Sequence, residues 1–268
     1  MPKPLHIVVC AGIVPDPLQT LEPVPGVVPT LKNEMMLPAI MDPWGASALY
    51  EAAALAKKIP ETKVWLVSCA PKAKLQQVLM TISQKVPFEL VALDSPAGGF
   101  TEASEAAAVL AEAIQGIVGL DMTRLLVFGG WESSSRGAGA TLQIIGEKLG
   151  IHDQFQGVDE IAVQEGGSLK ILERVEGGKH QASICTAPPA LLGWATGSLP
   201  EPPNNPQVGM VAMRVVMPAL QKAKPVKVGS EGLSFTSVTA PKQQRDTKII
   251  KNVSADDIAK EIVEWIKK

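Results

Sequence analysis

Short, almost uninterrupted apolar runs alternate with longer alanine-rich segments in the first 150 residues, and this alternation limits the possible folds more than any other feature. The apolar runs occupy residues 5–10, 63–69, 89–93 and 124–128. Strands of this kind are buried on both faces, as in a parallel sheet that helices cover on each side. The segments between them repeat apolar positions at helical spacing, at residues 43–58, 72–84 and 101–117. The sequence therefore predicts an α/β fold with a doubly wound, mostly parallel sheet.

Composition agrees with a helix-covered sheet and narrows the class of partner. Apolar residues make up 46% of the 268 residues and aromatic residues only 4%, so aliphatic side chains must fill the core. The net charge of −2 offers no basic excess to neutralise a phosphate backbone, which argues against nucleic acid as a partner. No apolar run approaches the roughly 18 residues of a membrane span, and no cleavage-type signal is present. We expect a cytoplasmic protein without an integral membrane segment.

The three cysteines, Cys10, Cys69 and Cys185, are far apart and lie in apolar runs. This predicts buried free thiols in a reducing compartment and gives no metal-ligand spacing. His6, His152 and His180 have no serine, cysteine or carboxylate in a triad context. The sequence therefore predicts no catalytic residue and no metal site.

The pattern changes after Gly150. Residues 158–163 and 168–175 flank a Glu-Gly-Gly turn and alternate apolar with polar side chains, which predicts an antiparallel hairpin, and residues 181–186 predict a further strand. Residues 188–211 are rich in Pro, Gly and Asn, and we expect no core element there.

The last part of the chain predicts an arm. Residues 223–248 contain few apolar side chains and are expected to be extended. Residues 254–268 predict an amphipathic helix, with Ser254 as N-cap. The apolar face of this helix requires either a partner subunit or the chain's own domain to cover it.

A glycine-rich stretch, GGWESSSRGAGATL at residues 129–142, leaves the fourth apolar run and enters a helical pattern near Gly139. The free N–H groups at a helix start attract an anion, and glycines allow the backbone to approach it closely. Ser133 and Thr141 add hydroxyl groups, and Arg136 adds a forked cationic donor. The residues alone leave two interpretations open, a phosphate-binding loop and a flexible connection.

Several segments, in this order and spacing, resemble the beta (small) subunit of electron transfer flavoproteins over nearly the whole chain. The matching segments are AGIVPD at 11–16, MDPWGASALYEA at 41–52, SCAP at 68–71, GWESSSRGAGATL at 130–142, ERVEGG at 173–178 and VMPALQKAKP at 216–225. The resemblance implies a Rossmann-like nucleotide-binding domain at 1–200, followed at 201–268 by a partner-docking loop and a C-terminal arm with its terminal helix.

The resemblance also implies a function. Such a subunit forms a heterodimer with an alpha subunit that carries FAD, and the dimer moves electrons between flavin dehydrogenases and a quinone-reductase-type acceptor. The small subunit binds an adenine nucleotide itself, which is AMP in ordinary members and a second FAD in electron-bifurcating members. Carried over by position, the nucleotide-contacting residues are Cys10, Asp42, Cys69, Gly130, Ser133, Arg136, Gly137, Gly139, Ala140 and Thr141. The docking site for dehydrogenases falls on Met217 and Pro218, with extra residues at 209–215.

The sequence departs from the family pattern within the glycine-rich loop. Ser135, Arg136 and Gly137 stand where relatives carry three aspartates, and Gly139 and Ala140 replace an Asn-Gln pair. An arginine among small residues suits a pyrophosphate and favours FAD. Residues 98–106, GGFTEASEA, lack the element typical of bifurcating members, so AMP and an empty or altered site stay open beside FAD.

Two other classes use related sheets. A stand-alone nucleotide-binding module of the universal-stress type needs no C-terminal arm. An ATP-pyrophosphatase-type ligase carries its SGGxDS loop after the first strand, whereas the glycine-rich loop of this chain follows the fourth apolar run.

Overall fold

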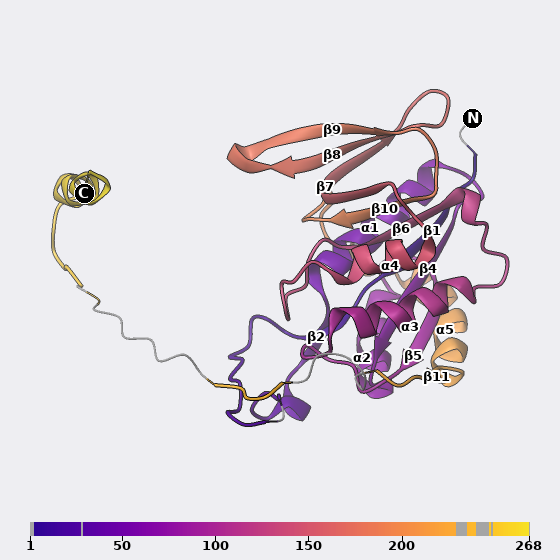
Figure 1. Cartoon of the computed structure of the whole chain (residues 1–268), viewed down its shortest axis with the longest axis horizontal. Coiled ribbons are helices and arrows are strands. Elements are labelled where there is room, and N and C mark those ends of the chain that lie inside the picture. Colours follow the sequence, from indigo (N-terminus) through magenta and orange to yellow (C-terminus); the bar gives the residue numbers. More distant parts are fainter. Residues whose placement is uncertain (1–2, 28, 229–234, 240–246, 248, 268) are drawn as a thin grey trace.

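One sheet organises the protein, as seen in a computed structural model that describes residues 3–27, 29–228, 235–239, 247 and 249–267 (Figure 1). Within these residues the strands run in the order β11-β5-β4-β1-β6-β10-β7-β8-β9. Their bounds are β1 His6–Cys10, β4 Lys63–Ala70, β5 Glu89–Asp94, β6 Leu125–Gly130, β7 Gln154–Val163, β8 Leu169–Val175, β9 Lys179–Cys185, β10 Ala190–Trp194 and β11 Lys224–Pro225. The pairs from β11 to β7 are parallel, and β7, β8 and β9 are antiparallel. The predicted α/β fold with an antiparallel hairpin is confirmed.

Helices cover both faces of the parallel part. The apolar cluster on one face includes α1 (Pro43–Lys58), α2 (Lys72–Ile82) and α5 (Pro206–Gln221). The cluster on the other face includes α3 (Ala103–Gln115) and α4 (Thr141–Leu149). Successive residues of β1 alternate between the clusters, since Ile7 and Val9 belong to the first and Val8 to the second. This two-sided burial explains why the strand is apolar at every position.

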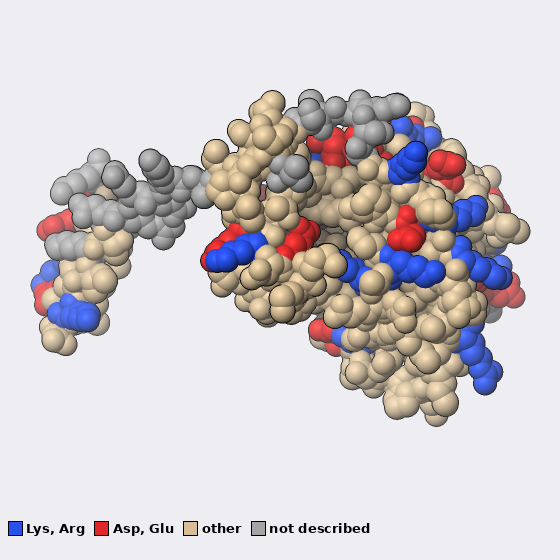
Figure 2. Space-filling model, turned by 90° about the horizontal axis from the view of Figure 1, so that it is seen from below, with Lys and Arg blue, Asp and Glu red and all other residues tan. Residues whose placement is uncertain are grey.

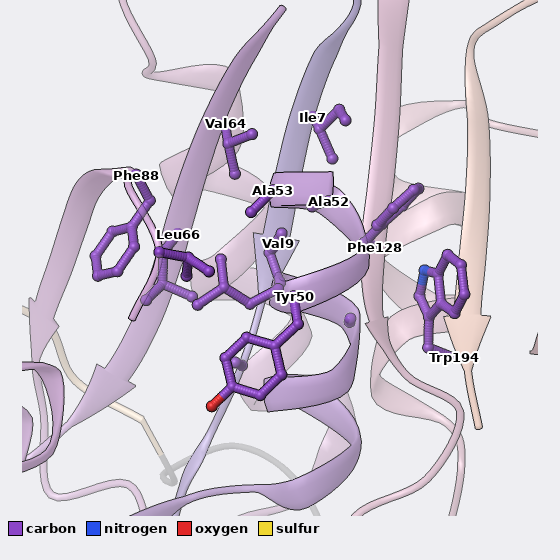
Figure 3. Packing of buried hydrophobic residues seen from close by; sticks show 14 of the residues in the cluster. Ile7, Val9, Tyr50, Ala52, Ala53, Val64, Leu66, Phe88, Phe128 and Trp194 are labelled. Carbon is purple, nitrogen blue, oxygen red and sulfur yellow. The ribbon is translucent and has the colours of Figure 1, made fainter. Parts of the chain in front are cut away.

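Helix α1 fills the centre of the first cluster. Asp42 caps it by accepting a hydrogen bond from Trp44 N, and Pro43 occupies its first turn. Its small residues Ala52 and Ala53 face the sheet, so the helix lies close to β1 and β4 (Figure 3). Phe128 and Trp194, with ring centroids 5.3 Å apart, extend the cluster across β6 and β10.

The expectation of no core element at residues 188–211 is wrong. Residues Ala190–Trp194 form β10, which is fully buried between β6 and β7. A central strand has no polar face, so it shows no alternation. Four apolar residues and a glycine, flanked by prolines and a further glycine, resemble a loop in sequence. Helix α5 begins in the same segment, at Pro206, with Asn205 as its N-cap.

The chain contains smaller elements outside the sheet and its covering helices. Strands β2 (Ile13–Pro15) and β3 (Ala39–Met41) pair antiparallel after β1, and short 3-10 turns occur at Glu34–Met36, Met122–Arg124 and Glu176–Gly178.

Helix α6 (Ala255–Ile266) stands apart from the body in Figures 1 and 2, with Ser254 as its N-cap. Its apolar side chains are exposed, Trp265 by 66%. Parts of the predicted arm, 229–234, 240–246 and 248, lie outside the described residues.

Candidate functional site: a cavity at the β1–β6 switch point

The sheet changes direction at β1. The chain adds β4 and β5 on one side of β1 and then crosses back to place β6 on the other side. In open parallel sheets the loops after two such strands diverge, and the crevice between them is where ligands bind. A cavity of about 170 Å³ lies at this point. Its walls are residues 10–14 after β1, the start of α1, residues 97–99 after β5, and the glycine-rich loop after β6.

The fold brings the predicted site residues together. Nine of the ten line this cavity: Cys10, Asp42, Cys69, Gly130, Ser133, Arg136, Gly139, Ala140 and Thr141. Gly137 belongs to the same loop but is not among the residues that line the cavity. The clustering follows from topology, because the parallel strands β1, β4 and β6 end at one edge of the sheet, and Asp42, just before α1, lines the cavity there. Their contact with a nucleotide stays a prediction.

The start of helix α4 gives the cavity an anion-attracting wall. Its N-cap is Ala140, whose methyl side chain cannot accept a hydrogen bond from the first turn. Ala140, Thr141 and Leu142 all line the cavity. Gly139 turns the chain into the helix with φ +63°, and a Cβ there would lie 2.9 Å from Trp131 O. The positive end of the helix is therefore presented to the cavity without a side-chain cap.

Two glycines let helix α1 approach the ends of β1 and β6. A Cβ on Gly130 would lie 2.6 Å from Glu132 O and 2.8 Å from Trp44 Cβ. A Cβ on Gly45 would lie 2.8 Å from Ala11 Cβ. Gly130 thus has a packing role, which does not require it to contact a ligand.

Asp42 connects α1 to the glycine-rich loop. One carboxylate oxygen caps Trp44 N at 3.1 Å. The other accepts from Ser134 N at 2.8 Å and from Ser134 Oγ at 3.1 Å. Burial raises the pKa of this carboxyl group, and the hydrogen bonds from Ser134 and Trp44 oppose the rise. Since these donors occupy both oxygens, Asp42 acts first as a fixed point for the loop.

Arg136 binds across the cavity to the start of α3. Its Nη1 donates to Thr101 O at 2.7 Å, and its Nη2 donates to Glu102 Oε2 at 3.0 Å. Glu102 is the N-cap residue of α3 but does not cap that helix with its side chain. Two nitrogens of the guanidinium are thus already bonded to protein, so a ligand phosphate has to share or replace these contacts.

The two cysteines at the cavity form part of its apolar wall. Burial raises the pKa of the Cys10 thiol to about 12. Burial also raises the pKa of Cys69, against a hydrogen bond from Ser95 that lowers it. Both thiols are therefore protonated at neutral pH, and neither is a nucleophile. Cys10, Cys69 and Cys185 are free, as predicted.

Sequence reasoning considered the loop after β5 only for the family element that residues 98–106 lack, and did not predict that Thr101 and Glu102 are the partners of Arg136. It also missed Glu132, which lines the cavity. Topology was the signal that could have found this loop. Strand β5 is parallel to β4, so the loop after β5 starts at the same edge of the sheet as the site.

The predicted docking residues lie elsewhere, on α5. Met217 is half-buried against the first apolar cluster, and Pro218 is exposed. The expected docking loop is wrong in conformation, because residues 209–215 and both predicted residues are helical. The Asn-Pro helix start at 205–206 forms the same kind of N-terminus as Asp42-Pro43 does in α1.

The described residues contain neither a cluster of metal ligands nor a membrane-spanning helix. No group of three or more His, Cys, Asp or Glu side chains in them could hold a metal ion. None of the helices they form is long and apolar enough to cross a membrane.

Comparison with known proteins identifies a family. No curated protein matches the chain. The family model of the electron transfer flavoprotein domain matches residues 33–229, which span α1, both sheet-covering layers, the glycine-rich loop and α5. The match covers well over half of the chain, and the chain belongs to the electron transfer flavoprotein domain family.

Proposed function

We propose that this chain is the beta subunit of an electron transfer flavoprotein and that the cavity at the β1–β6 switch point binds an adenine nucleotide. The observation that carries the proposal is the uncapped start of α4, which opens on a cavity lined by nine predicted contact residues. An alpha subunit would carry the redox-active FAD. The pair would transfer electrons between a flavin dehydrogenase and a quinone-reductase-type acceptor.

The residues around the cavity suit an adenine nucleotide. Backbone N–H groups at the start of α4 would bind phosphate, together with the hydroxyl groups of Ser133, Ser135 and Thr141. Leu110 and Ile145 offer apolar surface to a base. Glycines at 130 and 139 let the loop pack closely against α1 and against itself beside the cavity. When bound, FAD accepts and releases electrons, whereas the residues of this chain bind and orient it.

AMP and FAD remain the two candidates for this cavity. Arg136 is the residue that favours a pyrophosphate, and its guanidinium contacts Thr101 O and Glu102. These contacts reduce the number of donors it offers to a ligand, so Arg136 does not favour FAD as strongly as the sequence suggests. Electron bifurcation, which requires the second FAD, follows only if FAD binds here.

The C-terminal part is proposed to bind protein partners. Residues 1–200 would be the nucleotide-binding domain, and residues 201–268 the docking region and arm. Met210, Val211 and Met213 on α5 are exposed by 66%, 64% and 44%, near the predicted docking residues Met217 and Pro218. Apolar side chains at this density on one helix are typical of an interface. The three free thiols support a reducing, cytoplasmic setting.

Binding of AMP and FAD to the purified chain tests the nucleotide site. Gly139→Ala adds a Cβ 2.9 Å from Trp131 O at φ +63°, which should displace the start of α4 and weaken binding at least 10-fold. Gly167→Ala is the matched control, because Gly167 also has positive φ, at +92°, but lies in the β7–β8 turn. Equal affinity of Gly139→Ala and Gly167→Ala would overturn the placement of the site. Nucleotide binding without any complex with an FAD-carrying subunit would favour the stand-alone module.

A further inference from the structure

The C-terminal arm returns to the body beside the candidate site. Val226 N donates to Asp94 O at 2.9 Å, immediately after β11 pairs with β5. Further along, Gly26 and Val238 exchange two backbone hydrogen bonds, of 3.1 and 2.7 Å. The described residues 235–239, named here the arm segment, thus lie against the excursion between β2 and β3 (Figure 1).

The arm segment also contacts the loop after β5. The rings of Phe235 and Phe100 meet edge to face, with centroids 5.9 Å apart and an interplanar angle of 87°. Phe100 is half-buried, and Phe235 is 40% exposed. Edge-to-face pairs at this separation are attractive beyond the area they bury.

The loop that carries Phe100 forms one wall of the cavity. Its neighbours Gly98, Gly99 and Thr101 all line the cavity. A Cβ on Gly99 would lie 3.0 Å from Ser135 Cβ, so the loop is packed closely against the glycine-rich loop. On the same side, Arg136 bonds to Thr101 O and Glu102. The loop is therefore held between the glycine-rich loop and the arm segment.

The loop itself has little regular structure. Its internal hydrogen bonds include Thr101 N to Gly98 O at 3.0 Å and Gly98 N to Thr101 Oγ1 at 2.9 Å. A Cβ on Gly98 would have no atom within 4 Å. Segments with few internal contacts open at low free-energy cost, so their position depends on the surfaces that hold them.

We propose that Phe235 is a positioning residue of the nucleotide site: from the C-terminal arm, it holds Phe100 and thereby keeps the loop at 97–102 closed over the cavity. The inference rests on the proposed nucleotide function. Because coupling between two binding events is reciprocal, a bound nucleotide then favours the docked arm segment, and a displaced arm lowers the affinity for the nucleotide.

The dissociation rates of radiolabelled AMP and FAD from the full chain test this role. Phe235→Ala removes the edge-to-face ring pair. We therefore expect this variant to release nucleotide about 2- to 10-fold faster than the wild type. Phe235→Tyr keeps the ring and should restore the slow rate, because the exposed edge leaves room for a hydroxyl group. Trp265→Ala removes an exposed aromatic ring from α6, on the same arm, and should leave the rate unchanged.

A double mutant shows whether the two rings act through each other. Phe100→Ala should accelerate release as Phe235→Ala does, and the double variant should be no faster than the faster single variant. The proposal would be overturned if the double variant showed the product of the two single effects on the release rate. It would also be overturned if Phe235→Ala released nucleotide at the wild-type rate.

Hydrogen exchange of the nucleotide-free chain separates this proposal from the proposed function. Phe235→Ala should speed exchange of the amides at 97–102 and leave those of β1 unchanged. If the wild type binds neither nucleotide but the exchange at 97–102 responds, the nucleotide function fails while the positioning of the loop stands. Unchanged exchange at 97–102 contradicts the positioning role whatever the chain binds.

Discussion

Gly130→Ala tests the close approach of helix α1 to the ends of β1 and β6. The added Cβ would lie 2.6 Å from Glu132 O and 2.8 Å from Trp44 Cβ, both shorter than real Cβ contacts. Neither atom is at the end of a flexible side chain, so the helix start or the loop has to move. Overpacking of this kind costs about 1–3 kcal/mol of unfolding free energy. For a chain of this size, that lowers the midpoint of thermal unfolding by about 2–12 °C.

Circular dichroism during heating measures this shift, and Gly12→Ala is the matched control. Gly12 lines the same cavity, but a Cβ there meets no atom within 4 Å, and its φ lies outside the left-handed region. We expect Gly12→Ala to unfold within about 2 °C of the wild type, since a compatible Gly→Ala change costs little. Equal midpoints for Gly130→Ala and Gly12→Ala would refute the argument that Gly130 is required for helix packing.

Three further predictions concern charged groups. Asp42→Asn keeps an N-cap but turns an amide toward Ser134 N–H, and should destabilise the fold by about 1–3 kcal/mol in urea unfolding. Burial is the larger cause and the guanidinium of Arg124 the second, and together they lower the pKa of His6 below 6.5. The unfolded chain then binds more protons, so stability should fall as pH drops below about 6.5, and His6→Asn should flatten that slope in urea titrations at several pH values. Arg136→Ala should weaken nucleotide binding by about 1.5–3 kcal/mol if its guanidinium reaches phosphate. Glu102→Gln should weaken it less, because the amide oxygen can still accept a hydrogen bond from Arg136 and the contact with Thr101 O is kept.

Matched variants control these predictions. Asp121→Asn changes a half-buried N-cap of a short 3-10 turn and should cost less than Asp42→Asn, because Asp42 is more deeply buried. His152→Gln removes an exposed imidazole and should keep the acid slope, since His6 is intact. Arg214→Ala removes an exposed arginine of α5 and should leave nucleotide affinity unchanged. If a control variant changes stability, the acid slope or nucleotide affinity as much as its test variant does, the role given to the tested residue is wrong.

Helix α1 and the parallel strands were predictable because local chemistry determines them. Asp42 and Pro43 mark the start of α1, and the observed bounds Pro43–Lys58 equal the prediction. Uniformly apolar runs marked β1, β4, β5 and β6, to within two residues at each end. Strand β10 was not predictable in this way, because a short central strand among prolines and glycines has neither alternation nor length.

The candidate site was predictable in composition but not in its contacts. Residues at the ends of β1 and β6 were expected in one site because the family resemblance carried them over by position. The partner of Arg136 could not be read from the sequence, since Glu102 lies 34 residues away and is brought close only by the crossover through α3. The contact of Phe235 with Phe100 likewise depends on where the arm returns.

The number of nucleotides bound per heterodimer tests the central claim most directly. The chain is co-expressed with a candidate FAD-carrying subunit, the complex is purified, and the FAD and AMP released by heat denaturation are counted. We predict one FAD from the partner and one further adenine nucleotide from this chain, with only the latter lost in Gly139→Ala. Two FAD per dimer would identify the second nucleotide as FAD, and one FAD with one AMP would identify it as AMP. A stable complex that releases a single FAD and no other nucleotide would contradict the account.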